Sequence, residues 1–144
     1  MLERGMNMIF MVKYKIERQV ILYKEYGKEV IWSQDGISFL KQWCLQHGST
    51  FEGRKDAAMY ILKCRQKVPI LISEKTRDLI FPTSSYLNNT CIWINYKYIK
   101  NVNVHPNGVI VQFCDDREYV IPISMRSMKR SINLCKKYYT YLYQ

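Results

Sequence analysis

Two residues of the chain pair a nucleophile with a base at a spacing that could bring them together. Cys44 and His47 lie three positions apart, so one helical turn would place a thiol beside an imidazole, as nucleophilic catalysis or metal binding requires. The other histidine is His105, and no second ligand pair follows at a zinc-like spacing. We therefore interpret Cys44 as a core thiol and His47 as a residue near a helix end. Cys91 and Cys114 alternate within apolar strands and are also interpreted as core residues.

The glycines and the acidic residues do not complete a catalytic set either. Gly48 and Gly53 are not followed by the Lys-Ser or Lys-Thr pair of a phosphate-binding loop. The carboxylates gather only at Asp115 and Asp116, in a turn where solvation explains them. We predict that the protein is not an enzyme, uses no metal or other cofactor, and has no small-molecule substrate.

Lysine and arginine indicate a different chemistry, the binding of a polyanion. The formal net charge is +10, and residues 49–77 hold seven basic and three acidic residues, while residues 125–144 hold five basic and no acidic ones. Nine of the ten net charges therefore lie in two blocks, which favours nucleic acid as the partner, and an anionic membrane surface second. The predicted DNA-binding residues are Arg54, Lys55, Lys63, Arg65, Lys67, Arg126, Lys129, Arg130, Lys136 and Lys137.

These cations can contribute affinity and specificity in different ways. Contacts to phosphate release counterions and carry no sequence information. Arg54, beside Gly53, is the leading candidate to read the narrow minor groove of AT-rich DNA, because arginine carries its charge on a thin planar group. Two alternatives stay open: a basic module that binds a protein or an anionic membrane, and a single-strand binder that stacks bases on the tyrosines near the C-terminus. For those tyrosines, packing is the favoured interpretation: Tyr138, Tyr139, Tyr141 and Tyr143.

The first basic block begins on a predicted helix over residues 50–63, and Arg65 and Lys67 follow just past it. Ser49 and Glu52 have the spacing of a capping box, and the apolar residues that follow recur on one face. Pro69 ends helical structure, so residues 68–73 and 79–81 are expected to form a hairpin.

The flanking segments predict further strands and one more helix. Residues 12–16, 20–23 and 29–32 read as strands of an N-terminal hairpin, after a disordered start over residues 1–11. Ser33 or Asp35 caps a short helix that ends at His47-Gly48. Later strands are expected at 91–94, on both sides of Asn107-Gly108, and at 119–123.

The second basic block lies on a predicted C-terminal helix with an apolar seam. The seam either covers the chain's own sheet, which we favour, or meets its twin in a homodimer. Its residues are Met125, Met128, Ile132, Cys135, Tyr139 and Leu142.

Together the elements predict an α+β protein: an antiparallel sheet of several hairpins, two central helices and a basic amphipathic C-terminal helix. A length of 144 residues suits a single domain. No apolar run approaches the roughly 20 residues of a membrane span, so no membrane partner is expected. Five cysteines without a paired motif predict reduced thiols in a cytoplasmic protein.

Four short motifs, in order and with compatible spacing, resemble the competence transcription factor (ComK) family of Gram-positive bacteria. The resemblance covers roughly residues 38–124, including Ile121-Pro-Ile-Ser124. The motifs are Cys44-x-x-x-Gly48-Ser49-x-x-x-Gly53-Arg54-Lys55, Lys67-x-Pro69-Ile70, Phe81-Pro82-Thr83-x-Ser85 and Cys91-x-Trp93-Ile94.

The resemblance implies a nucleoid-associated transcription activator of DNA-uptake genes. It implies binding to AT-rich duplex through the minor groove, as dimers on paired boxes and without a helix-turn-helix motif. Longer relatives carry an additional C-terminal tail tied to dimer behaviour and regulated proteolysis. This sequence stops soon after its basic helix, so a homodimer and proteolytic control stay open.

Overall fold

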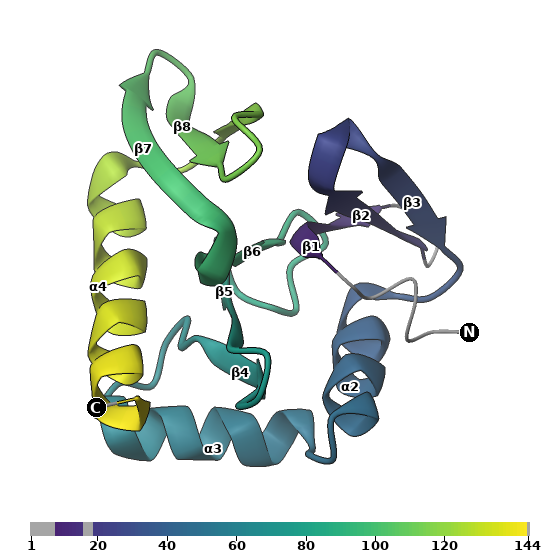
Figure 1. Cartoon of the computed structure of the whole chain (residues 1–144), viewed down its shortest axis with the longest axis vertical. Helices are drawn as coiled ribbons and strands as arrows, with labels where there is room; N and C mark the ends of the chain where they lie inside the picture. Colours follow the sequence, from purple (N-terminus) through teal and green to yellow (C-terminus); the bar gives the residue numbers. More distant parts are fainter. Residues whose placement is uncertain (1–7, 16–18, 144) are drawn as a thin grey trace.

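The computed structural model describes residues 8–15 and 19–143, and its architecture is α+β, as predicted (Figure 1). Within these residues, six antiparallel strands pair in the order β3-β2-β1-β6-β5-β4, and a second sheet has the order β7-β8-β9. The strands are β1 (Ile9–Lys15), β2 (Gln19–Lys24), β3 (Glu29–Trp32), β4 (Ile70–Ser73), β5 (Asp78–Pro82), β6 (Ile92–Asn95), β7 (Ile99–His105), β8 (Gly108–Phe113) and β9 (Glu118–Ile121). The helices are α2 (Gly36–Gln46), α3 (Phe51–Leu62) and α4 (Met125–Leu142), with short 3₁₀ turns η1 (Glu25–Gly27) and η2 (Tyr96–Tyr98).

Strand β1 lies inside the larger sheet, between β2 and β6. The side chains of Ile9, Phe10 and Met11 are at most 3% exposed. The expectation of a disordered start is therefore wrong for residues 9–11, because their apolar side chains fill the core. Residues 1–7 of that expected start lie outside the described residues.

The caps of α2 and α3 show why two helices follow one another so closely. Asp35 accepts a hydrogen bond from the Ser38 amide (2.9 Å) and starts α2, as one of the two predicted caps. Thr50 starts α3, because its Oγ1 accepts from the Gly53 amide at 3.0 Å. The predicted Ser49–Glu52 capping box is thus wrong by one residue. The Ser49 hydroxyl instead donates to the Cys44 carbonyl at 3.2 Å, which closes the end of α2.

The hairpin of β7 and β8 turns at Pro106 and Asn107, where the sequence predicted a hairpin. Gly108 opens β8 with a φ of +144°, and a Cβ atom there would lie 2.1 Å from the Ile121 carbonyl oxygen. Only glycine fits this close approach of β8 to the end of β9.

Helix α4 packs its apolar stripe against the chain itself. In Figure 1, α4 lies to the left of β4 and β5, and α3 lies below them. Helix α4 contacts α3, β5 and β8. Met128 and Cys135 of the predicted seam are fully buried, and the other four seam residues are partly buried against the core. Of the two sequence alternatives, the seam therefore covers the chain's own sheets. The deepest tyrosine is Tyr138, one residue before the predicted Tyr139.

Replacing Met128 with alanine tests this packing. Loss of a fully buried side chain should lower the free energy of unfolding by about 2–5 kcal/mol, measured by urea denaturation. The exposed neighbour Lys129→Ala should change it by less than about 0.5 kcal/mol. Since the packing lies within one chain, the midpoint for Met128→Ala should not depend on protein concentration. A concentration-dependent midpoint would instead indicate that the stripe holds two chains together.

Candidate nucleic-acid interface

The outward face of α4 carries a ladder of cations. Arg126, Lys129, Lys136 and Lys137 are all exposed, and α4 contains no acidic residue. Arg126 and Lys137 are eleven residues apart, which spans about 16 Å along a helix. A ladder of this kind matches the line of negative charge along a nucleic-acid backbone.

Arg130 joins this ladder to the first basic block. Its Nη2 donates to the Gln66 carbonyl at 2.9 Å and lies 2.9 Å from the Cys64 sulfur. Both partners belong to the loop between α3 and β4, in which Lys63 and Lys67 have left-handed backbones with φ near +50°. Two blocks that are about sixty residues apart in the sequence therefore meet. We call the exposed cations around this junction the α4–loop surface: Lys63, Arg65, Arg126, Lys129 and Lys137.

Arg54 does not belong to this surface. Its side chain is only 18% exposed, and its Nη1 donates to the Glu74 carboxylate at 3.3 Å. Burial of the aliphatic stem and the ion pair give Arg54 a role within the fold. Arg54 was the leading candidate for reading bases, and the sequence did not indicate its partner Glu74, which lies twenty residues later in the chain.

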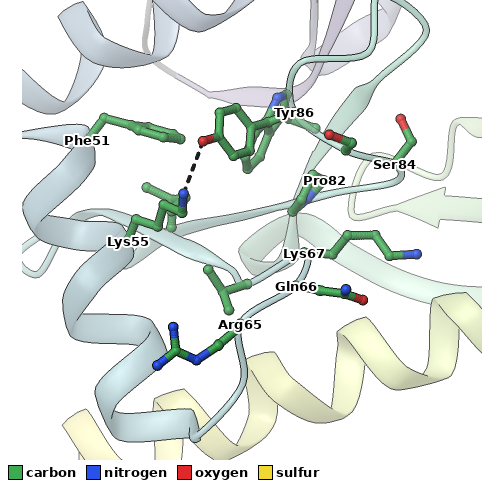
Figure 2. Close-up of a pocket in the computed structure, with 12 residues that line it drawn as sticks. Phe51, Lys55, Arg65, Gln66, Lys67, Pro82, Ser84 and Tyr86 are labelled. Carbon is green, nitrogen blue, oxygen red and sulfur yellow. Dashed lines mark hydrogen bonds between the residues drawn. The ribbon is translucent and has the colours of Figure 1, made fainter.

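Lys55 also points inward, into a pocket between α3 and the loops. Figure 2 shows Lys55 and Tyr86 pointing toward one another beside the ring of Phe51. The Lys55 ammonium donates to the Tyr86 hydroxyl at 3.0 Å and lies 4.7 Å from that ring's centroid. The pocket has a volume of about 390 Å³, and its far side is formed by the loop of Arg65 and Lys67.

A second cationic groove lies between α4 and β7, and sequence analysis missed it. Lys136 lines it together with Lys97 and Lys100, which were not among the predicted residues. Lys97 lies 3.8 Å from Asp78, and Lys100 pairs with Asp116. The signal in the sequence was weak, because these two lysines fall in a region whose overall charge is slightly negative.

The Cys44–His47 pair is not a nucleophile and base. Cys44 is fully buried, and burial raises the pKa of its thiol to about 12. His47 is the C-cap of α2, so both residues have the structural places the sequence suggested. Cys91 is buried, as predicted, but Cys114 is exposed. That second expectation is wrong because Cys114 follows the end of β8 and begins a turn.

Three of the four C-terminal tyrosines are occupied by packing. Tyr138 is buried, the Tyr139 hydroxyl donates to the Arg77 carbonyl, and the Tyr143 hydroxyl donates to the Glu74 carbonyl at 2.9 Å. Tyr141 is 60% exposed. The interpretation that these rings mainly pack is thus confirmed for three of them.

These observations define the protein as a small basic α+β protein in which exposed cations of one helix and an adjacent loop lie close together. Among residues 8–15 and 19–143, no three histidine, cysteine, aspartate or glutamate side chains form a cluster that could hold a metal ion. None of the helices in the described part of the chain is long and apolar enough to cross a membrane.

A comparison with protein-family models matches residues 4–144 to the family described as ComK protein. The match covers nearly the whole chain, so the chain belongs to the ComK family, a family of competence transcription factors. Searches of curated proteins and of solved structures each found no match.

Removing the Arg130 guanidinium should loosen the α3–β4 loop. In Arg130→Met, trypsin should cleave after Arg65 about tenfold faster, because a hydrogen bond to a charged group contributes on the order of 1.5–3 kcal/mol. The cleavage product can be followed by mass spectrometry under native conditions. Arg126→Met is the matched control, since Arg126 makes no ion pair or hydrogen bond with its side chain in the described part of the chain. Equal cleavage rates in both variants would show that Arg130 does not hold the loop.

Proposed function

We propose that the protein is a bacterial transcription activator that binds double-stranded DNA through the α4–loop surface. The observation that carries this proposal is the Arg130 contact to Gln66, which unites the two basic blocks. An exposed, continuous set of cations without an intervening carboxylate on α4 is suited to phosphate contacts on one face of a duplex. As the regulatory context we propose genes for DNA uptake, in the cytoplasm at the nucleoid, because the chain belongs to a family of competence transcription factors.

We further propose that the protein prefers AT-rich sites and reads their minor groove with Arg65. Arg65 is exposed on the α3–β4 loop, whereas Arg54 is held by Glu74. A minor groove is about 6 Å wide and is narrower in A-tracts, where its negative potential attracts a guanidinium group. The exposed side chain of Arg65 can enter such a groove, whereas the side chain of Arg54 is largely buried and paired with Glu74.

A homodimer on paired sites remains part of the proposal, with one change. Because the apolar stripe of α4 is buried within the chain, contact between two copies has to use another surface. The other predicted phosphate contacts, Lys136 and Lys67, lie at the margins of the α4–loop surface and are retained in the proposal.

The structure offers less support for the alternative of single-strand binding. Base stacking needs exposed aromatic faces, and Tyr138, Tyr139 and Tyr143 are engaged by the fold. Of these four C-terminal tyrosines, Tyr141 is the exposed one, and a single ring is a weak platform for stacking. Duplex binding is therefore the function that the arrangement supports best.

Salt dependence tests duplex binding directly. If about six phosphates are contacted, the logarithm of the binding constant should fall with the logarithm of salt concentration at a slope near −5, measured by fluorescence anisotropy. Lys137→Ala should weaken binding to every duplex alike and reduce the slope by about 1. Lys28→Ala, an exposed lysine just before β3, is the control and should leave the slope unchanged. No duplex binding at low salt would refute the proposal.

Groove reading is tested by competition between AT-rich and GC-rich duplexes. Arg65→Ala should reduce the preference for the AT-rich duplex by about 1–3 kcal/mol. Lys137→Ala should weaken both duplexes equally, because a phosphate contact does not report sequence. If Arg65→Ala also weakens both duplexes by the same factor, Arg65 is one more phosphate contact and another residue reads the groove.

A further inference from the structure

The pocket beneath Tyr86 is not explained by duplex binding. Its walls come from α3, the α3–β4 loop, β4, β5, the β5–β6 loop and β6. Phe51, Val68, Ile70 and Trp93 form apolar parts of these walls and are each at most 5% exposed. A rigid duplex can touch cations at the pocket's rim, but it cannot enter a recess of about 390 Å³. That volume lies within the range of roughly 300–1,000 Å³ typical of small-molecule sites.

The Lys55 ammonium, which lines this pocket, makes fewer hydrogen bonds within the described residues than it has N–H groups. An ammonium group has three N–H donors, and one of them is used on the neutral Tyr86 hydroxyl. Within the described residues, Lys55 has no carboxylate partner, and none of the residues lining the pocket is acidic. An anion in the pocket can therefore accept hydrogen bonds from the remaining N–H groups of Lys55 and pair with its charge.

The rim adds positive charge and hydrogen-bonding groups around this cation. Arg65 and Lys67 line the side formed by the α3–β4 loop, although the charged ends of both extend away from Lys55 and Tyr86 (Figure 2). Ser84 and Ser85 lie on the side formed by the β5–β6 loop. Low-dielectric walls with charge of one sign concentrate anions, and the adjacent rings of Phe51 and Tyr86, 5.7 Å apart, offer an aromatic surface.

We propose that this pocket binds a small organic anion: a carboxylate, sulfonate or phosphate group attached to an apolar ring or short chain. The anionic group replaces the Tyr86 hydroxyl as the partner of Lys55, and the apolar part lies against the ring of Phe51. This assignment does not depend on DNA binding.

A consequence for regulation does rest on the proposed function. Arg65 belongs both to the rim of the pocket and to the α4–loop surface. An anion in the pocket neutralises part of the positive potential that attracts DNA, so occupancy should weaken duplex binding. The pocket would then let a small molecule control the regulator.

The aromatic sulfonate 8-anilinonaphthalene-1-sulfonate is a suitable probe, used with the full chain in a fluorescence titration. We expect saturable binding of one probe per chain, weakened at least tenfold in Lys55→Met. Lys28→Met removes an equal charge from an exposed position just before β3 and should leave probe affinity unchanged, whereas Lys55→Arg should stay within threefold of the parent. Equal affinities in Lys55→Met and the parent would overturn the proposal.

Two further measurements hold even if Lys55→Met folds poorly. In the unsubstituted protein, intermolecular nuclear Overhauser effects should connect the probe to the rings of Phe51 and Tyr86, and contacts only elsewhere would overturn the assignment. The uncharged analogue N-phenyl-1-naphthylamine should bind at least tenfold more weakly, and equal affinity would refute the requirement for an anion.

The regulatory consequence has its own test. Saturating probe should weaken binding of an AT-rich duplex at least threefold in the parent but not in Lys55→Met, and no change in the parent would overturn the consequence. If the parent binds the probe at Lys55 but binds no duplex with or without it, the proposed function fails and the pocket assignment stands.

Discussion

Burial of one stripe of α4 is the constraint on which the rest of the surface depends. The five cations of α4 do not by themselves determine which side of the helix faces the protein. Packing of Met128, Cys135 and Tyr138 into the core fixes its rotation about its axis. Only in that rotation do Arg126 and Lys137 face outward while Arg130 reaches the Gln66 carbonyl. The charge pattern of the interface is therefore set by apolar contacts on the opposite side of the same helix.

Periodic patterns in the sequence predicted the elements well, because helix and strand periods are local properties of the chain. Residues 50–63 and 125–142 became helices within a residue or two, and the hairpin at Asn107-Gly108 formed. The differences from the structure arise where a side chain's partner is far away in the sequence, or where two neighbouring residues could make the same hydrogen bond. Arg54 was assigned to DNA because Glu74 is twenty residues away, and adjacent Ser49 and Thr50 have equivalent capping chemistry. Nothing in the sequence pattern indicated the Arg130–Gln66 contact, which spans 64 residues.

Two neighbouring cations on α3 show how position on a helix decides the chemistry of a side chain. Arg54 and Lys55 differ by about 100° around the axis. Arg54 finds a carboxylate on the β4–β5 turn, and its charge is balanced within the fold. Lys55 meets the rings of Phe51 and Tyr86, and within the described residues it donates to the neutral Tyr86 hydroxyl and pairs with no carboxylate. Of two adjacent cations, one is therefore paired with a carboxylate and the other is not, a distinction that composition cannot make.

Two lysines of the α3–β4 loop, Lys63 and Lys67, have the left-handed backbone conformation. For a side chain with a Cβ atom, that conformation costs about 1 kcal/mol relative to glycine. Glycine at both positions would relieve this backbone strain, and the contacts of Arg130 to Cys64 and Gln66 would still hold the loop against α4. An engineer who optimised this chain for thermal stability alone would therefore make that exchange and erase two positive charges from the loop. The loop thus accepts a strained backbone at two positions and in return carries two lysine charges.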